Sequence, residues 1–386
     1  MKIRKEFALL YEVLTEFPVV ALVGPRQCGK TTMAKMVEGQ IPKSCLYLDL
    51  ELSSDLAKLN EAELYLKSHE DKLIVIDEVQ HKPELFSLLR ALVDQKSENS
   101  RFLILGSASP QLLRQTAEAL TGRIFYLELT PFSYMEVADE KPLREHWFLG
   151  GYPKSFFAKT LAASQRWQAQ YIKNYIERDL PQLGLNVSPV VIERFWRMLA
   201  SYHGGIWNAS KIAQAMGLSN NTIAKYLYYL EEAFLVHSLP PYFQNSLKRL
   251  VKSPKVYIRD SGLFHHLVYI YSLEQLMGDI RLGASWEGYV VEQIRIVTLE
   301  KCKLYFYRTH NGAECDLVLV KNGLPWMSIE IKFSSQPTIS RGFFESIADL
   351  KTKENYVVIP EGDAYPMHPE VKAIGLVQLI KILENQ

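Results

Sequence analysis

The segment that most restricts the fold is a glycine-bounded loop between an apolar run and a helical pattern. Residues 19–23 are consecutive apolar residues with the length of a short buried strand. Residues 24–32 have the sequence GPRQCGKTT, and the apolar residues after them recur at helical spacing. This is the pattern GxxxxGK[ST] in the strand–loop–helix context of a P-loop. The sequence therefore predicts an α/β domain that binds the phosphates of a nucleotide.

Each residue type in this loop suits phosphate binding. Glycines let the backbone curl so that N–H groups and the helix N-terminus face the β-phosphate, Lys30 reaches the β- and γ-phosphates, and Thr31 is a ligand for Mg²⁺. A thiol in the loop could block the nucleotide on oxidation or alkylation, or it could be inert. The residues predicted to bind ATP are Gly24, Pro25, Arg26, Gln27, Cys28, Gly29, Lys30, Thr31 and Thr32.

A second apolar run ends in two carboxylates. Residues 73–78 have the sequence LIVIDE, which is typical of a strand that is buried on both faces and delivers acids at its carboxyl end. Asp77 is predicted to hold Mg²⁺, and Glu78 to orient and deprotonate the attacking water. The two acids could instead cap the next helix. Glu78 beside Asp77 favours water, rather than a metabolite hydroxyl, as the nucleophile.

Three further strand-like runs predict a parallel α/β sheet of five strands in all. They are residues 45–50, 101–109 and 124–129. Arg123 directly precedes the last run and is a candidate arginine finger, supplied from the same or a neighbouring subunit. A structural salt bridge or a loop position is the alternative for Arg123.

The small formal net charge of +1 is the sum of unequal parts. Residues 1–140 carry 16 Lys and Arg against 21 Asp and Glu, residues 141–282 carry 17 against 9, and residues 283–386 carry 11 against 13. The positive charge is therefore concentrated in the middle. A basic block favours contact with a polyanion such as DNA, although solvated Lys and Arg faces are common.

Within this basic block, residues 208–227 have a helix, a glycine turn and a second helix, which is the spacing of a helix-turn-helix. Ser210 and Ser219 are the predicted N-caps. The second helix would present side chains that can meet phosphates or base edges. These candidate DNA contacts are Asn220, Asn221, Thr222 and Lys225. The alternative is a winged-helix unit that serves only in protein packing.

The last hundred residues contain a third group of chemically suited side chains. Residues 283–297 are predicted to be helical, with Glu287 on an apolar face that calls for a partner. Residues 313–320 and 328–333 are predicted to form a hairpin that carries Asp316 on one strand and Glu330 and Lys332 on the other. Carboxylates that bind Mg²⁺ beside a lysine are what a PD-(D/E)xK nuclease needs. The alternative is an amphipathic hairpin with an exposed ion pair.

The chain as a whole resembles prokaryotic AAA-type P-loop ATPases with a C-terminal domain of unknown function 4143. The resemblance rests on the loop and the carboxylate-ended strand, together with LTGR (120–123), TPFSYMEV (130–137), GGYP (150–153), YIERDL (175–180), WEGYVVE (286–292), AECDLVLV (313–320) and IEIKFS (329–334). It implies ATP binding and hydrolysis, a winged-helix segment and a restriction-endonuclease-like C-terminal fold. Similar AAA-type ATPases place a polar group where Ser107 ends the fourth strand, to contact the γ-phosphate or the water.

The expected organisation is an ATPase domain at 1–140, a helical and winged-helix region at 141–282 and a nuclease-like domain at 283–386. The predicted catalytic residues are Glu78, Lys30, Arg123 and Ser107, with ATP and Mg²⁺ as ligand and cofactor. DNA and a second copy of the chain are the candidate partners. An ATP-dependent switch for a protein partner and a P-loop phosphotransferase are the alternative functions.

Composition and cysteine placement exclude other classes. With 48% hydrophobic and 23% charged residues, the chain is of an ordinary globular type. Its cysteines lie far apart without CxxC spacing, which argues against a disulfide framework and a zinc site and favours the cytoplasm. They are Cys28, Cys45, Cys302 and Cys315. No apolar run has the length of a membrane span, and no signal peptide is expected.

Overall fold

The structure is a computed structural model that describes residues 2, 4–108, 120–243, 251–299 and 301–386, so Ser109 of the predicted fourth strand lies outside it. Its contacts divide the chain into two units. Unit 1 is formed by 1–132, 178–186 and 228–235, and unit 2 by 133–177, 187–227 and 236–386. Neither predicted boundary, near 140 or 282, is tested by this division. In the described ranges, no helix has both the length and the apolar character to cross a membrane.

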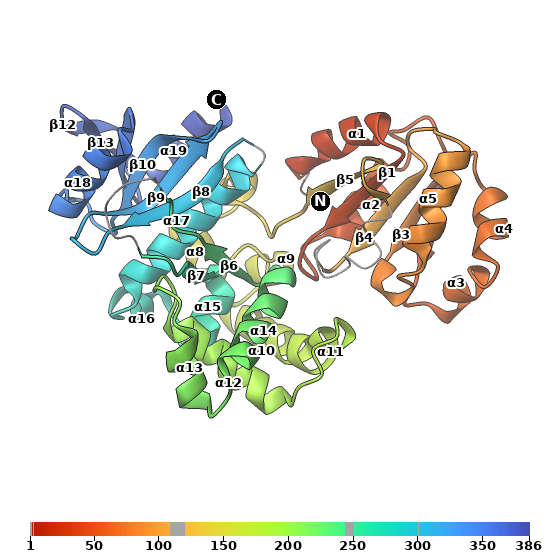
Figure 1. The fold of residues 1–386 in the computed structure, drawn as a ribbon, viewed down its shortest axis with the longest axis horizontal. Coiled ribbons are helices and arrows are strands. Elements are labelled where there is room, and N and C mark those ends of the chain that lie inside the picture. Colours follow the sequence, from red (N-terminus) through yellow and green to blue (C-terminus); the bar gives the residue numbers. More distant parts are fainter. Residues whose placement is uncertain (1, 3, 109–119, 244–250, 300) are drawn as a thin grey trace. The chain divides into compact units, whose positions relative to one another are not determined.

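Unit 1 is built on the five-stranded parallel sheet that the sequence predicts (Figure 1). Its strand order is β2-β3-β4-β1-β5, and all neighbours are parallel. β1, β3 and β4 are buried along their whole length, as the continuous apolar runs predict. The bounds are β1 Val19–Val23, β2 Cys45–Asp49, β3 Leu73–Asp77, β4 Phe102–Gly106 and β5 Ile124–Glu128.

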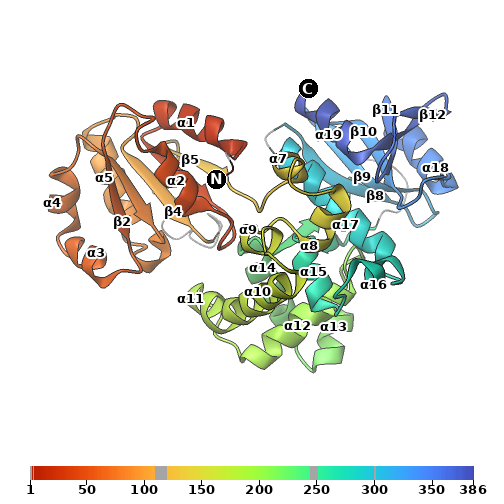
Figure 2. The ribbon, with the colours of Figure 1, turned by 180° about the vertical axis from the view of Figure 1, so that it is seen from behind.

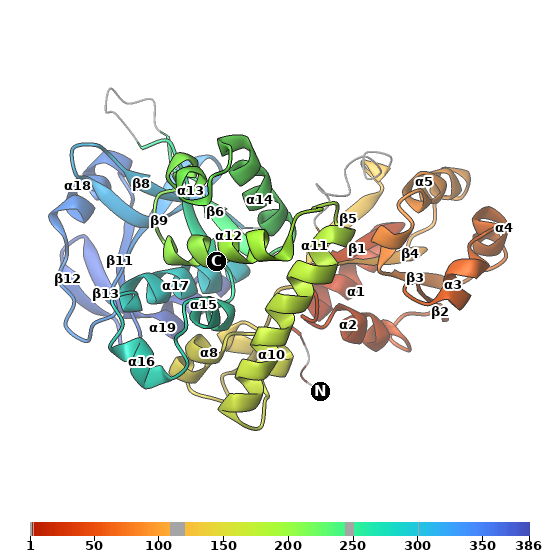
Figure 3. The same cartoon turned by 90° about the horizontal axis from the view of Figure 1, so that it is seen from below.

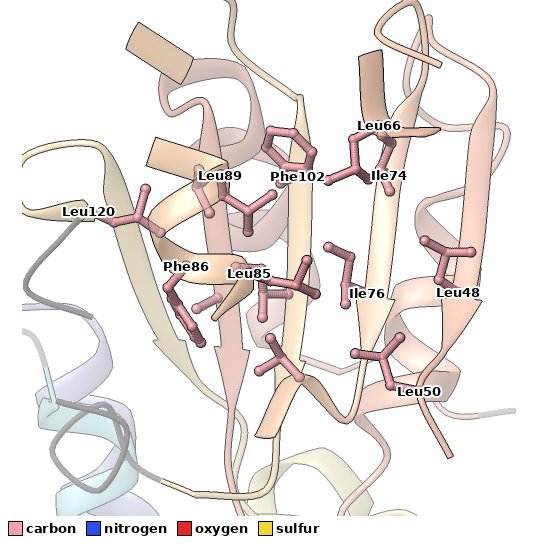
Figure 4. Packing of buried hydrophobic residues seen from close by; sticks show 14 of the residues in the cluster. Leu48, Leu50, Leu66, Ile74, Ile76, Leu85, Phe86, Leu89, Phe102 and Leu120 are labelled. Atoms are coloured by element: carbon pink, nitrogen blue, oxygen red, sulfur yellow. The ribbon is translucent and has the colours of Figure 1, made fainter. Parts of the chain in front are cut away.

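Both faces of this sheet are covered by apolar side chains of helices. One face packs against α1 (Glu6–Glu16) and α2 (Lys30–Val37). The other packs against α3 (Ser53–Lys58), α4 (Ala62–Lys67) and α5 (Leu85–Gln95), as Figure 4 shows for Leu66, Leu85 and Leu89 against Ile74 and Phe102. Burying each such side chain contributes about 1.5–3 kcal/mol. Because helices pack on both faces of the sheet, the carboxyl ends of the strands and the loops that follow them are held in place.

Unit 2 begins with α7 (Tyr134–Val137), α8 (Leu143–Leu149), α9 (Pro153–Phe156) and α10 (Leu161–Asn174). The first of the two glycines after α8 has no room for a side chain. Gly150 has φ 77°, and a Cβ there would lie 2.3 Å from Asp260 Oδ1. The amide of Gly151 donates to Asp260 Oδ2 at 2.8 Å. Asp260 is the N-cap of α15 (Ser261–Leu267), so this turn helps to hold the cap in place. A π-helix, η3 (Tyr175–Asp179), and α11 (Leu180–Gln182) follow α10 across the division into units.

Three helices, which Figure 3 shows, and a two-stranded sheet follow in the order of a winged helix. They are α12 (Pro189–Ser201), α13 (Ala209–Met216), α14 (Asn220–Glu232), β6 (Val236–Leu239) and β7 (Lys255–Ile258). The predicted helix–turn–helix is confirmed, with Gly217 in the left-handed conformation. The Ser219 hydroxyl accepts from Thr222 N at 3.1 Å, as a cap should. Ser210 as the first N-cap is wrong, because Asn208 accepts from Lys211 N instead.

The C-terminal part of unit 2 is a mixed six-stranded sheet in the order β12-β13-β11-β10-β9-β8 (Figure 2). Its helix α17 (Leu282–Thr298) and its β9–β10 hairpin confirm the predicted elements, although β10 begins four residues earlier than expected. The bounds are α16 Leu273–Met277, β8 Lys303–Arg308, β9 Glu314–Lys321, β10 Leu324–Ile331, α18 Arg341–Leu350, β11 Glu354–Ile359, β12 Tyr365–His368, β13 Val371–Gly375 and α19 Leu376–Glu384.

Candidate functional site: a phosphate loop at three strand ends

The P-loop follows β1 and is shaped by glycines at its two ends. Gly24 has φ 152°, and a Cβ there would lie 2.1 Å from the carbonyl oxygen of Leu129, so no side chain fits. Gly29 has φ 112° and stands directly before α2, where it turns the chain into the helix. The loop therefore presents the N-terminus of an eight-residue helix to the carboxyl edge of the sheet, the edge at which ligands bind in open α/β sheets.

Lys30 is the first residue of α2, directly after this loop, and is only 7% exposed. Its Nζ donates to the carbonyl oxygens of Gly24 and Pro25, both at 2.9 Å, and to Ser107 Oγ at 3.3 Å. Ser107 directly follows β4, the strand between β1 and β3. The structure thus brings the predicted lysine and the predicted polar group of the fourth strand into direct contact.

Thr31 and Asp77 form the pair expected for a magnesium site. Thr31 Oγ1 donates to Asp77 Oδ2 at 2.8 Å, across 46 residues of sequence. The Tyr47 hydroxyl of β2 donates to the same carboxylate oxygen. Burial raises the pKa of Tyr47, and the hydrogen bond to Asp77 raises it further, so this phenol stays protonated as a donor. Hydroxyl and carboxylate oxygens are the hard ligands that Mg²⁺ prefers, so this donor set fits the ion.

Glu78 follows β3 in a left-handed backbone conformation, with φ 54°. Its Oε2 accepts from Ser107 Oγ at 3.2 Å and also from Gln80 Nε2. A non-glycine residue with positive φ is strained, and such residues concentrate at functional sites. This conformation places the Glu78 carboxylate beside Ser107, which also contacts Lys30.

Arg26 of the loop lies among three carboxylates. Its guanidinium is 2.7 Å from Asp179 Oδ1, 2.8 Å from Glu51 Oε1 and 3.6 Å from Glu78 Oε1. Burial lowers the pKa of Arg26, but the charges of Glu78 and Asp179 more than offset this, so its pKa is raised. Glu51 also pairs with Arg178 at 2.7 Å. The loop is thereby tied to residues 178–179, which belong to the same unit.

For two other residues of the predicted site, the structure favours the structural alternative over the functional one. Arg123 is at the amino end of β5, where it pairs with Asp94 at 2.5 Å, whereas the P-loop follows the carboxyl end of the paired strand β1. Five strand residues span about 16 Å, so a contact with the P-loop from within unit 1 conflicts with this placement. Cys28 is 1% exposed, and burial raises the pKa of its thiol, which favours the inert alternative.

The candidate DNA contacts lie at the start of α14. Asn220, Asn221 and Lys225 are exposed and Thr222 is partly exposed, whereas Ile223 is buried. The amphipathic pattern of the sequence therefore separates the packed face of this helix from its outer face correctly.

Two of the four residues of the predicted nuclease site, Glu287 and Asp316, share a lysine of unit 2 that the sequence did not indicate. Lys255 Nζ lies 2.8 Å from Glu287 Oε1 and 3.4 Å from Asp316 Oδ1. Lys332 pairs with Glu330 at 3.0 Å. Across the part of the chain that the structure describes, no group of three or more His, Cys, Asp or Glu is placed to hold a metal ion.

Sequence reasoning also missed Tyr47, Gln80, Asp179 and Lys255. Gln80 follows Glu78 by only two residues in the sequence and could have been considered. The others reach their sites from distant strands or helices, and neither periodicity nor spacing marks them.

Three family models match successive parts of the chain. They are an AAA domain over residues 16–138, a domain of unknown function (DUF8612) over residues 140–274 and a domain of unknown function (DUF4143) over residues 282–379. Among solved structures, a Walker-type ATPase of Pyrococcus abyssi is 15% identical with a TM-score of 0.46, covering 69% of this chain and 96% of its own.

Relatives of the chain occur in bacteria. Uncharacterized proteins of Mycobacterium tuberculosis and Mycobacterium bovis are each 39% identical, over 98% of this chain and 84% of their own length. An uncharacterized protein of Haemophilus influenzae is 24% identical, over 66% of this chain and 70% of its own length. The chain therefore belongs to the same family as these mycobacterial proteins, as a P-loop ATPase with an N-terminal AAA domain, DUF8612 in the middle and DUF4143 at the C-terminus.

Proposed function

We propose that the chain hydrolyses ATP to ADP and phosphate with Mg²⁺ at the carboxyl ends of β1, β3 and β4. The observation that carries this proposal is the hydrogen-bonded series from Lys30 through Ser107 to Glu78. It links a phosphate-binding cation to a candidate general base through the polar group between them. Phosphoryl transfer depends mainly on positioning and charge stabilisation, which is what such an arrangement supplies.

Each residue has a distinct part in this proposal. Lys30 would move its N–H donors from the loop carbonyls to the β- and γ-phosphate oxygens. Thr31 and Asp77 would hold Mg²⁺, which supplies positive charge against the phosphates when bound. Glu78 would orient the attacking water and accept its proton, with Ser107 and Gln80 fixing the carboxylate. Phosphate release without an added acceptor would distinguish hydrolysis from the phosphotransferase alternative.

Nucleotide binding is tested with a matched pair of lysines in α2. Lys30→Ala should weaken ATP binding at least about 100-fold, because it removes a buried cation that points into the loop. Lys35→Ala, at an exposed position of the same helix, should bind within about twofold of wild type. Calorimetric titration with ATP and Mg²⁺ measures both, and equal affinities of the two variants would overturn the site.

A second candidate function is DNA contact through α14. It is supported by the exposure of Asn220, Asn221 and Lys225 within the segment whose net charge is +8, from 17 basic and 9 acidic residues. Lys225→Ala should weaken duplex binding and reduce its salt dependence, whereas Lys67→Ala, in α4 of unit 1, should not. If wild type binds no duplex even at low salt, this candidate is excluded and the ATP-dependent protein switch becomes the better account.

We do not extend the proposal to DNA cleavage by Glu287, Asp316, Glu330 and Lys332. Cleavage of that kind needs carboxylates that are available to a metal ion. The first two already share the ammonium of Lys255, and Glu330 pairs with Lys332.

A further inference from the structure

The acidic site of unit 2 converges on one ammonium group. Lys255 Nζ donates to Glu287 Oε1 at 2.8 Å and to Asp316 Oδ1 at 3.4 Å, and Glu314 Oε1 lies 4.0 Å away. These carboxylates come from α17 and β9, two separate elements of the C-terminal part. The lysine comes from β7 of the winged-helix segment, in the same unit.

The lysine is held as an integral part of this site. Its side chain is 5% exposed, and that of Glu287 is 19% exposed. Burial lowers the pKa of Lys255, but the negative charges of Glu287 and Asp316 raise it well above its usual value, so the ammonium is charged at neutral pH. Tyr257 lies two residues along β7 and donates to the same Glu287 oxygen at 2.6 Å.

Three carboxylate oxygens at this site, Glu287 Oε1 and both oxygens of Asp316, accept from donors of the protein. Asp316 Oδ2 accepts from the amide of Ile331 at 3.0 Å, while its other oxygen faces Lys255. The pairing of β8 with β9 shifts register between Tyr305 and Tyr307, beside Asp316. A bulge of this kind re-aims the side chains next to it. The local backbone therefore directs Asp316 toward the buried ammonium.

We propose that the ammonium of Lys255 is the built-in cation of this site and occupies the position between Glu287 and Asp316 that a divalent cation would need. The ammonium offsets one of the two carboxylate charges directly, without a metal ion. Its role is to join β7 of the winged-helix segment to α17 and β9 through a buried network of charged hydrogen bonds. Removing the lysine would leave two uncompensated carboxylates, which a divalent cation could then neutralise.

The first measurement asks whether a metal ion binds while Lys255 is present. Mn²⁺ binding to the full chain is followed by electron paramagnetic resonance, in an Asp77→Asn background that removes the carboxylate of the ATP site. Asp77→Asn and Asp77→Asn/Asp316→Asn should bind Mn²⁺ equally. Tighter Mn²⁺ binding by Asp77→Asn than by Asp77→Asn/Asp316→Asn would overturn the proposal. This outcome does not depend on whether a Lys255 variant folds.

The second measurement removes the lysine in the same Asp77→Asn background. Lys255→Ala should lower the thermal midpoint of unit 2, and millimolar Mn²⁺ should then raise it by at least about 3 °C, an effect absent when Lys255 is present. Lys332→Ala, which removes a more exposed lysine beside Glu330, should gain no such response. If Lys255→Ala does not fold, Lys255→Met takes its place, because it keeps the length of the side chain without its charge. The proposal would be contradicted if Mn²⁺ did not raise the thermal midpoint of a folded variant at Lys255. It would also be contradicted if the rise were the same after Asp316 is replaced by Asn.

Discussion

Arg26 is held by carboxylates that lie far from it in the sequence. Asp179, which it contacts at 2.7 Å, is largely buried, and burial raises the pKa of that carboxyl group. A guanidinium in this position both neutralises Asp179 and lies near the catalytic candidate Glu78. The P-loop motif allows any residue at position 26, so the sequence pattern carries no signal for this role.

Arg26→Ala should therefore loosen the segment 178–186 within unit 1. Removing one partner of a largely buried ion pair costs about 3 kcal/mol, or roughly a 100-fold increase in local opening. Hydrogen exchange of these amides measures the effect. Arg178→Ala is the control, because its side chain is 55% exposed and its pair with Glu51 should contribute less than about 1 kcal/mol. Equal protection in the two variants would contradict the assigned role of Arg26.

Two buried histidines give unit 2 a pH-dependent stability. Burial lowers the pKa of His265 to about 4 and that of His203 to about 3, so both are neutral in the folded chain. His265 lies between Phe148 O at 3.0 Å and Ser285 Oγ at 2.7 Å. In the unfolded chain each would take up a proton below about pH 6.5. Their contribution is therefore complete above pH 6.5 and is lost as the pH falls toward 4.

His265→Asn should reduce this loss by about 1.4 kcal/mol per pH unit between pH 6 and 4, because one of the two proton-binding differences is gone. All six tryptophans lie in unit 2, so their fluorescence during urea unfolding follows this unit. His310→Asn, at an exposed histidine, is the control and should keep the wild-type slope. Parallel pH profiles for wild type and His265→Asn would refute the prediction.

At the scale of single residues, the sequence predicted which candidate residues lie together wherever a motif fixes both spacing and chemistry. Lys30, Thr31, Asp77 and Ser107 lie together because their loops follow three neighbouring parallel strands. Tyr47 was not predicted, because a tyrosine within a strand has no pattern that distinguishes a ligand-facing position from a packing one.

Helix α17 brings a partly buried carboxylate and two buried aromatic rings of unit 2 together. It carries Glu287, and the next residue, Gly288, packs against His203 and Tyr257. A Cβ at position 288 would lie 2.1 Å from His203 Nε2 and 3.2 Å from Tyr257 Cδ1. The helix can therefore approach these rings only with glycine at this position.

Gly288→Ala should destabilise unit 2 by about 2–4 kcal/mol, because a methyl group would overlap a fully buried imidazole. Gly283→Ala, in the same helix with open space around its Cα, should be neutral or stabilising by up to about 1 kcal/mol. Urea unfolding followed by tryptophan fluorescence compares them. Similar midpoints for the two variants would show that the close approach to His203 does not constrain the helix.

Among the elements, the β9–β10 hairpin was predicted from the sequence, but the contact between α17 and β7 was not. Asn322 and Gly323 both have positive φ, so they form the type of turn that the Lys321-Asn322-Gly323 sequence favours between β9 and β10. Glu287 was expected to need a partner on the apolar face of its helix. That the partner is Lys255 could not be predicted, since it depends on how a strand of the winged-helix segment packs against α17.

At the scale of the whole molecule, unit 1 is assembled from three separate stretches of chain. Phe234 packs in the cluster on the α5 face of its sheet, and Asp179 pairs with the P-loop. Sequence analysis placed the end of the ATPase domain near residue 140, because the α/β alternation stops there. Contributions from short segments farther along the chain leave no such mark.

A fragment of residues 1–140 should therefore be less stable than unit 1 within the full chain. It lacks residues 178–186 and 228–235, so part of the apolar cluster and the largely buried Arg26 lose their partners. Differential scanning calorimetry with ATP, which identifies the transition of unit 1, should show a midpoint lower by about 5 °C or more in the fragment. An unchanged midpoint would support an independent domain that ends near residue 140.

The central claim is that the whole chain is an ATP hydrolase whose general base is Glu78. The most direct measurement is phosphate release from ATP and Mg²⁺ by wild type, Glu78→Gln and the exposed control Glu84→Gln. We expect steady turnover by wild type and Glu84→Gln, and turnover at least about 100-fold slower in Glu78→Gln, with ATP affinity retained. Turnover by Glu78→Gln within about twofold of wild type would contradict the account.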